Sequence, residues 1–119
     1  MQTSMSPEFM GHIKEKYNNQ KGQNYPCSNQ IVRNIIFAYS IDNVVLDYLQ
    51  KNNAHIVRNS KDRIEAIIKD ECWVVLPLKD NIRGYRAYKA RIDIRLMEEW
   101  VKTIILPMLG LYCCEVDFF

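Results

Sequence analysis

The sequence lacks the features that identify several large classes of protein. Its four glycines are isolated from one another, so the chain has no glycine-rich loop of the kind that cradles phosphate in nucleotide-binding enzymes. It also lacks any apolar run that approaches the roughly 18 residues of a transmembrane helix. These absences exclude P-loop and dinucleotide-binding enzymes and indicate no membrane partner. The glycines are Gly11, Gly22, Gly84 and Gly110.

The cysteines do not occur in metal-binding pairs. No two of them are separated by two residues, and both histidines, His12 and His55, are distant from any cysteine in the sequence. The chain shows no signal peptide, so we expect reduced thiols and a cytoplasmic location rather than a disulfide framework. We predict no metal and no cofactor. The cysteines are Cys27, Cys72, Cys113 and Cys114.

The composition is that of one ordinary domain with an uneven charge distribution. The chain has 119 residues, of which 48% are hydrophobic and 25% charged, and its net charge is +2. So small a net charge gives no strong attraction to nucleic acid or membrane as a whole. Residues 79–95, however, contain six basic and two acidic residues, so this segment carries +4 and the rest of the chain −2.

The N-terminal residues predict a polar lead without regular structure. Residues 1–9 resemble vector-derived sequence, because Ser-Pro-Glu-Phe is common there, and Met10 is then the expected native start. Residues 14–26 are rich in Asn, Gln, Lys and Gly and have no apolar period. We therefore expect a flexible lead over 1–26 and a single domain over 27–119. Abundant Ile and Asn suit an AT-rich genome such as that of a low-GC bacterium, a phage or a eukaryotic virus. Together with the suspected cloning scar, this fits a viral or mobile-element protein, or a fragment of one, and we then expect the host cytoplasm or nucleus.

Three segments have helical periodicity. Apolar residues recur at helical spacing over 31–39, after an N-cap candidate at Ser28, and again over 41–49 on the opposite side. Because one straight helix would expose one of these two stripes, we predict two helices with a break near Ser40. A third helix is predicted over 97–106, where the following proline ends it.

Five segments favour strands, most of them through apolar residues at a period of two. Over 60–68 a short helix is the competing interpretation, because the isoleucines there also fit helical spacing. Together the elements predict an α+β fold, with a mostly antiparallel sheet of about five strands and two or three helices packed on one face. The predicted strands are 55–59, 63–69, 72–78, 83–95 and 111–119.

The strand over 83–95 is the most informative segment, because alternation gives it one apolar and one basic face. The basic face predicts binding of single-stranded nucleic acid or another phosphate ligand, provided that Trp73 points outward to stack beside Tyr85. The competing interpretation is a solvated face whose charges discourage edge pairing. The predicted nucleic-acid-binding residues are Arg83, Tyr85, Lys89, Arg91, Arg95 and Trp73.

The C-terminal segment over 111–119 supports a different function. It is rich in β-formers and ends in two aromatic residues, so at a sheet edge it offers unpaired backbone and apolar side chains together. We therefore keep a second hypothesis, in which this strand forms a homodimer or binds a partner protein, as an interaction or inhibitor module. Alternatively, the strand pairs within its own sheet and Phe118 fills the core.

Asp93 supports a third hypothesis. Residues 91–96, Arg-Ile-Asp-Ile-Arg-Leu, are similar to the palm strand of family X DNA polymerases, in which that carboxylate helps to hold catalytic metal ions. The resemblance implies a metal-dependent nuclease or nucleotidyltransferase fragment. The chain has neither the Gly-Ser turn nor the Asp-x-Asp pair of that family, and one carboxylate cannot assemble a two-metal site. We therefore predict a binding module without catalytic residues.

Overall fold

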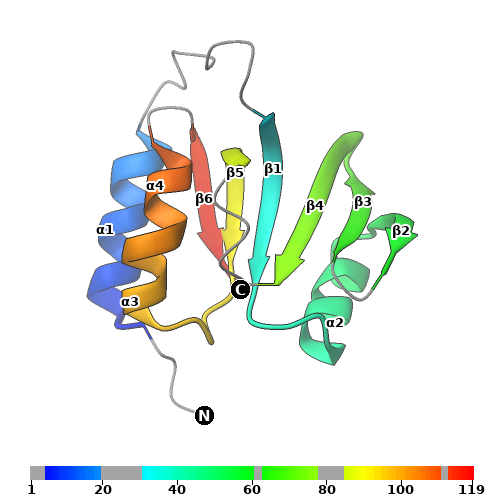
Figure 1. The fold of residues 1–119 in the computed structure, drawn as a ribbon, viewed down its shortest axis with the longest axis horizontal. Helices are drawn as coiled ribbons and strands as arrows, with labels where there is room; N and C mark the ends of the chain where they lie inside the picture. The colour runs from blue at the N-terminus through cyan, green and yellow to red at the C-terminus, as the bar shows by residue number, and fades with distance from the viewer. Residues whose placement is uncertain (1–4, 20–30, 61–62, 78–84, 111–112) are drawn as a thin grey trace.

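The fold is built on a six-stranded sheet, seen in a computed structural model that describes residues 5–19, 31–60, 63–77, 85–110 and 113–119 (Figure 1). The strand order is β2-β3-β4-β1-β5-β6. β1 runs parallel to β4 and β5, and β5 parallel to β6, whereas β3 is antiparallel to β2 and β4. The α+β class is confirmed, but the sheet is mixed rather than mostly antiparallel. The strands are β1 (Ile31–Ala38), β2 (His55–Asn59), β3 (Ile64–Ile68), β4 (Glu71–Pro77), β5 (Tyr85–Ile92) and β6 (Glu115–Phe118).

Residues 31–38 form a central strand, so the helix predicted there was wrong. Four consecutive residues, 35–38, are fully buried because the strand is covered on both faces. Ile35 and Phe37 face one core, and Ile36 and Ala38 face the other. A short apolar run of this kind fits helical spacing and a doubly covered strand equally well, and only the tertiary context separates them.

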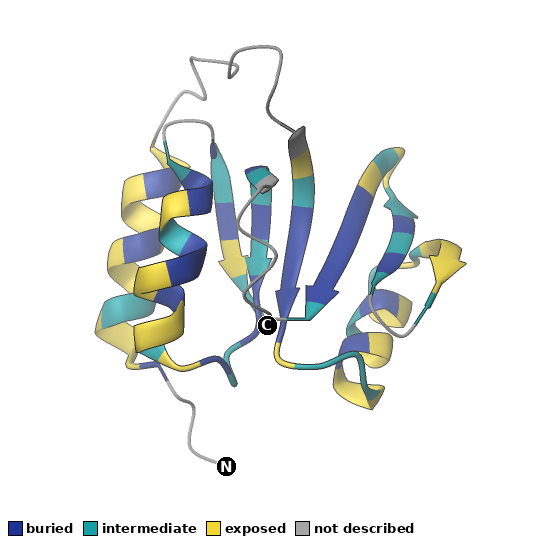
Figure 2. Ribbon diagram, in the orientation of Figure 1, coloured by how far each residue is buried: buried dark blue, intermediate teal, exposed yellow. Residues whose placement is uncertain are grey.

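Helices cover both faces of the sheet, and not one face as predicted. One face packs against α1 (Pro7–Asn18) and against a continuous helical segment made of α3 (Glu98–Trp100), the π-helical turn η2 (Val101–Ile105) and α4 (Leu106–Leu109) (Figure 1). The other face packs against α2 (Asn43–Lys51). The central strands are accordingly buried, while β2 is exposed along its whole length (Figure 2).

α1 lies where a lead without regular structure was predicted, and that prediction was wrong for residues 7–18. The hydroxyl of Ser6 accepts a hydrogen bond from the Phe9 N–H (3.1 Å), which caps the helix. Ile13 and Tyr17, four residues apart, are buried against the sheet. A stripe of only two residues is too short to stand out in the sequence. The vector origin of residues 1–9 stays a prediction.

The other predicted elements are found with shifted ends. β2, β3 and β4 match three of the predicted strands, and α2 replaces the helix predicted over 41–49, with Asp42 as its N-cap. The last helix runs past Pro107, because a wide π turn precedes the proline, and it ends at Gly110, whose φ of 49° favours glycine. None of the described helices is long and apolar enough to cross a membrane.

Two leucines of α2 test whether this helix seals the second face of the sheet. Leu49 is buried at 1% exposure, whereas Leu46 is 36% exposed on the same helix. We expect Leu49→Ala to lower the free energy of unfolding by about 2–5 kcal/mol, because it opens a cavity, and Leu46→Ala by less than about 1 kcal/mol. Urea unfolding followed by circular dichroism measures both, and equal losses would contradict the packing of α2.

Candidate binding sites

A β-bulge in β5 breaks the alternation on which the basic face was predicted. Opposite β1, Tyr88 is an extra residue. As a result Ala87 is fully buried in the same core as Ala90 and Ile92, although strict alternation placed it beside Lys89. β5 also ends at Ile92, so the residues that follow it lie beyond the sheet and not on its outer face.

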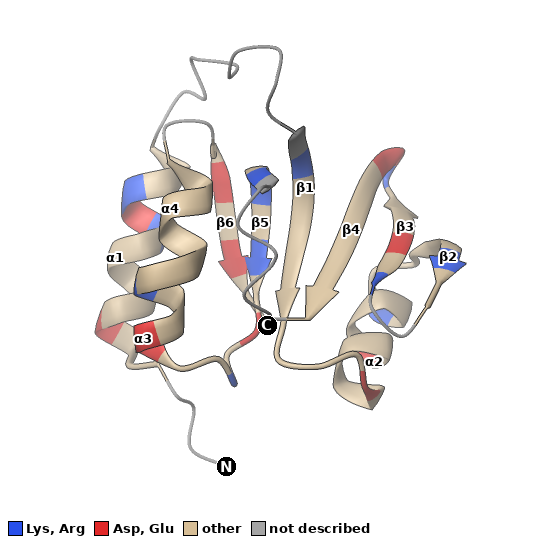
Figure 3. Cartoon of the chain, in the orientation of Figure 1, with Lys and Arg blue, Asp and Glu red and all other residues tan. Residues whose placement is uncertain are grey.

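Two cations of β5 are bound to carboxylates on other strands of the sheet. Lys89 Nζ lies 2.7 Å from Glu71 Oε2, and Arg91 Nη2 lies 2.6 Å from Glu115 Oε2. The hydrogen bond to Glu71 raises the pKa of Lys89. Basic stretches of β5 therefore lie beside acidic stretches of β6 (Figure 3). An anionic ligand on this surface would have to compete with two carboxylates that are already in place.

Trp73 does not supply the second stacking aromatic that the nucleic-acid hypothesis requires. It is 5% exposed and belongs to the core under α2. The guanidinium carbon of Arg91 lies 4.9 Å from the centre of its ring, and its indole Nε1 has no hydrogen-bond partner among the described residues. Arg83 and the side chain of Tyr85 lie outside the described residues. Binding through this face stays a prediction.

A hollow of about 360 Å³ over β3 and β4 brings together cations that are scattered in the sequence. We call it the arginine hollow; its lining residues include Arg33, Val57, Arg63, Glu65, Ile67, Cys72 and Trp73. Arg63 Nη2 lies 3.5 Å from Glu65 Oε1, and Arg58 Nη1 lies 3.9 Å from Glu65 Oε2 at the rim. Arg33 is exposed and forms no ion pair with any described residue. Glu65 thus pairs with two arginines, and Arg33 lines the same hollow.

Sequence reasoning missed this hollow because its cations come from different elements. Arg33 belongs to β1, Arg58 to β2, and Arg63 immediately precedes β3. None of these segments is basic by itself. Only the pairing of β3 with β2 and β4, and of β4 with β1, places them around one surface. Cys72 is exposed there.

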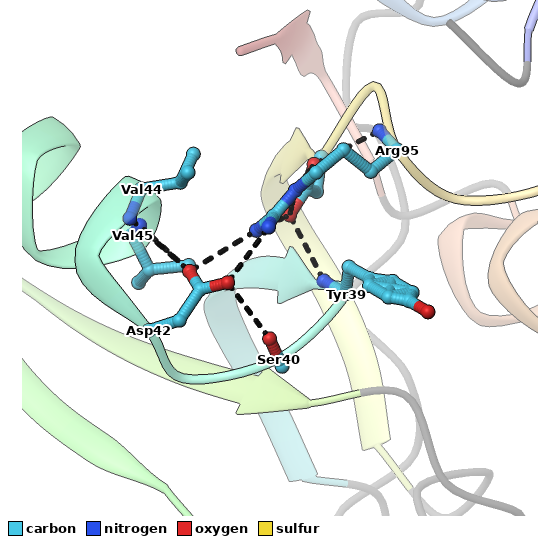
Figure 4. Close-up of polar contacts among 7 residues, drawn as sticks. Tyr39, Ser40, Asp42, Val44, Val45 and Arg95 are labelled. Carbon is cyan, nitrogen blue, oxygen red and sulfur yellow. Dashed lines mark hydrogen bonds and ion pairs between the residues drawn. The ribbon is translucent and has the colours of Figure 1, made fainter. Parts of the chain in front are cut away.

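A buried ion-pair network, not a metal site, surrounds Asp93. Its carboxylate is fully buried and accepts hydrogen bonds from the Tyr39 N–H (3.0 Å) and from Arg95 Nη2 (2.7 Å). Arg95 Nη1 binds Asp42 Oδ2 at 2.7 Å (Figure 4). The cation between the two carboxylates is therefore a guanidinium. Among the described residues no group of three or more His, Cys, Asp or Glu side chains is placed to hold a metal ion.

Asp42 joins this network to α2. Arg95, the Ser40 hydroxyl and the Val45 N–H hold the pKa of the Asp42 carboxyl well below its usual range, the arginine contributing most. The carboxylate therefore stays ionised at neutral pH. It also accepts the Val44 N–H at 3.2 Å, which caps α2. One guanidinium thus ties the end of β5 to the end of β1 and to the start of a helix.

The edge strand β6 carries backbone bonds on its outer side. The Asn18 side chain of α1 accepts from the Val116 N–H (2.7 Å) and donates to the Val116 carbonyl (3.2 Å), as a neighbouring strand would. The Phe118 N–H is bound by the Asp117 carboxylate at 2.9 Å. β6 pairs with β5 inside its own sheet, and Phe118 packs half-buried against the core. A dimer or partner through this edge stays a prediction.

Comparison with known proteins returns no relative. The chain matches no protein-family model, no curated protein and no solved structure. Its function is therefore inferred from the geometry of the described residues alone.

Removing Arg95 tests the network. Arg95→Ala leaves the buried Asp93 carboxylate without its main partner, so we expect a loss of ~3–5 kcal/mol in the free energy of unfolding. Arg33→Ala, an exposed arginine without an ion pair among the described residues, should change it by less than ~0.5 kcal/mol. Chemical denaturation at neutral pH measures both variants. A loss below ~1 kcal/mol for Arg95→Ala would refute the role given to the network.

Asn18→Ala tests whether the Asn18 amide protects the outer edge of β6. Without the amide, the Val116 N–H and carbonyl lose partners that water replaces only in part, so we expect destabilisation of about 1–2 kcal/mol. Glu15→Ala, an exposed change on the same helix, is the control and should be nearly neutral. Hydrogen exchange of the Val116 amide should also accelerate in Asn18→Ala but not in Glu15→Ala. Unchanged exchange in Asn18→Ala would show that its amide does not protect this edge.

Proposed function

We propose that the protein is a small non-catalytic binding module for a phosphate-bearing ligand, with single-stranded nucleic acid as the expected macromolecular form. The observation that carries the proposal is the arginine hollow, which is lined by Arg33 and Arg63, while Arg58 reaches its one lining carboxylate, Glu65, from β2. Among the described residues this gives a local excess of positive charge that the chain's net charge of +2 does not reveal.

The chemistry of the hollow suits a phosphate ester. A guanidinium presents a planar fork of N–H donors that matches phosphate oxygens, and it remains charged at any physiological pH. The volume of about 360 Å³ lies within the range of ligand pockets. Val57 and Ile67 give the hollow apolar walls, against which a sugar or a base can pack. Charge and apolar surface are thus available side by side.

The hollow is a better location for this function than the outer face of residues 83–95. There, Lys89 and Arg91 already make short ion pairs, and the side chain of Trp73 is inside the core. The two locations are separable by experiment, because no arginine of the hollow belongs to the 83–95 segment. The predicted kind of ligand is the same in both, and only the surface differs.

Binding of a fluorescein-labelled oligothymidylate, followed by anisotropy, tests the proposal. We expect binding at low salt that weakens as salt rises, because phosphate contacts release counterions. Arg33→Ala should weaken binding several-fold. It should also reduce the slope of log K against log salt by the amount expected for about one phosphate contact. Arg91→Ala is the matched control from the 83–95 face, and Lys51→Ala of α2 is a control for net charge.

Three outcomes would contradict the proposal or move it. No binding at low salt would refute the function, and a loss in Arg91→Ala but not in Arg33→Ala would return the site to the 83–95 face.

Alkylation of Cys72 gives an independent reading, since bound oligothymidylate or pyrophosphate should slow its reaction with iodoacetamide. Cys113 is an internal control, because burial raises the pKa of its thiol to about 12. Protection by oligothymidylate and not by pyrophosphate would identify a nucleic acid rather than a free phosphate ligand, and no protection by either would reject the hollow.

A further inference from the structure

A second hollow lies where the chain leaves the parallel strands β1 and β5. From the carboxyl end of β1 the chain passes into α2 on one face of the sheet, and from that of β5 it passes into α3 and α4 on the other. In open sheets with parallel strands, ligands bind in the crevice formed where neighbouring connections diverge in this way. Here the crevice measures about 250 Å³.

The walls of this crevice are large apolar side chains that are exposed to solvent. Tyr39 is 56% exposed, Met97 is 58% exposed and Trp100 is 37% exposed, and Leu96 lies behind them. Leaving such side chains in water costs free energy that a bound apolar group recovers. Tyr, Trp and Met are also the residue types that concentrate at binding surfaces. The walls therefore favour a ligand with a flat or apolar body.

The remaining lining residue, Arg95, determines the charge that the ligand can carry. Its guanidinium is held by Asp93 and Asp42, so its charge is already balanced by two carboxylates. An added phosphate would meet those carboxylates as well as the arginine. The guanidinium carbon lies 5.4 Å from the centre of the Tyr39 ring, so an aromatic ring already contacts this cation from within the crevice.

From these observations we infer that the crevice binds a flat, uncharged ring system of about the size of a nucleobase. The ring packs between Tyr39 and Trp100 and over the charge-balanced guanidinium of Arg95. The site is separate from the arginine hollow, with which it shares no lining residue, and it selects against the anionic group that the hollow attracts. Its ligand is therefore recognised by shape and stacking rather than by charge.

Fluorine NMR of the whole chain labelled with 5-fluorotryptophan tests this inference. The chain has two tryptophans, of which Trp100 lines the crevice and Trp73 lines the arginine hollow, and Trp100→Phe assigns the signals. We expect adenosine and caffeine to shift the Trp100 signal at millimolar concentration, whereas a shift of the Trp73 signal alone would place binding in the hollow. Adenosine monophosphate, with the same ring and an added charge, should bind the crevice at least several-fold more weakly by the same signal.

Variants of Tyr39 separate stacking from folding. The ring is exposed and only the backbone N–H of Tyr39 binds Asp93, so the network survives its truncation. Tyr39→Ala should weaken the effect of adenosine roughly tenfold. Tyr39→Phe should retain the effect, and Val57→Ala in the arginine hollow should not alter it.

An unchanged Trp100 signal with both probes, equal affinity for adenosine monophosphate, or full binding by Tyr39→Ala would each overturn the inference. Since the readout is confined to Trp100, loss of oligothymidylate binding would leave this result intact.

Discussion

The fold depends on how the charge of one buried carboxylate is compensated. Asp93 is fully buried at the end of the strand next to the sheet's centre, where an unpaired charge is very costly. Arg95 compensates it and reaches on to Asp42, so the strand β1 and the helix α2 are held to the same point as β5. The two helical layers lie on opposite faces of the sheet, and this network lies where the chain departs toward each of them.

Ion pairs also distinguish the two candidate binding surfaces. In the basic segment over 79–95, Lys89, Arg91 and Arg95 each bind a carboxylate. A ligand on that face would have to compete with these carboxylates. Arg33, Arg58 and Arg63 belong to no basic segment, and Glu65 pairs with two of them, Arg58 and Arg63.

The sequence predicted the helices and strands whose pattern lies within a few consecutive residues. The strands β2, β3 and β4 and the helix α2 follow from the spacing and composition of a few consecutive residues, and each was found. β1 was mistaken for a helix because a strand buried on both faces has no alternation to read. The bulge at Tyr88 and the ion pairs across β4, β5 and β6 depend on register between strands, which no local pattern encodes. For the same reason the arginine hollow could not be predicted.

The side chain of Asn18 has a consequence for how copies of this chain can associate. Because its amide binds Val116 as a neighbouring strand would, a second copy that paired along β6 would first have to displace this side chain. The opposite edge strand, β2, is exposed along its whole length and bears a bulge of its own. The two edges of the described sheet therefore differ in how easily another strand can pair with them.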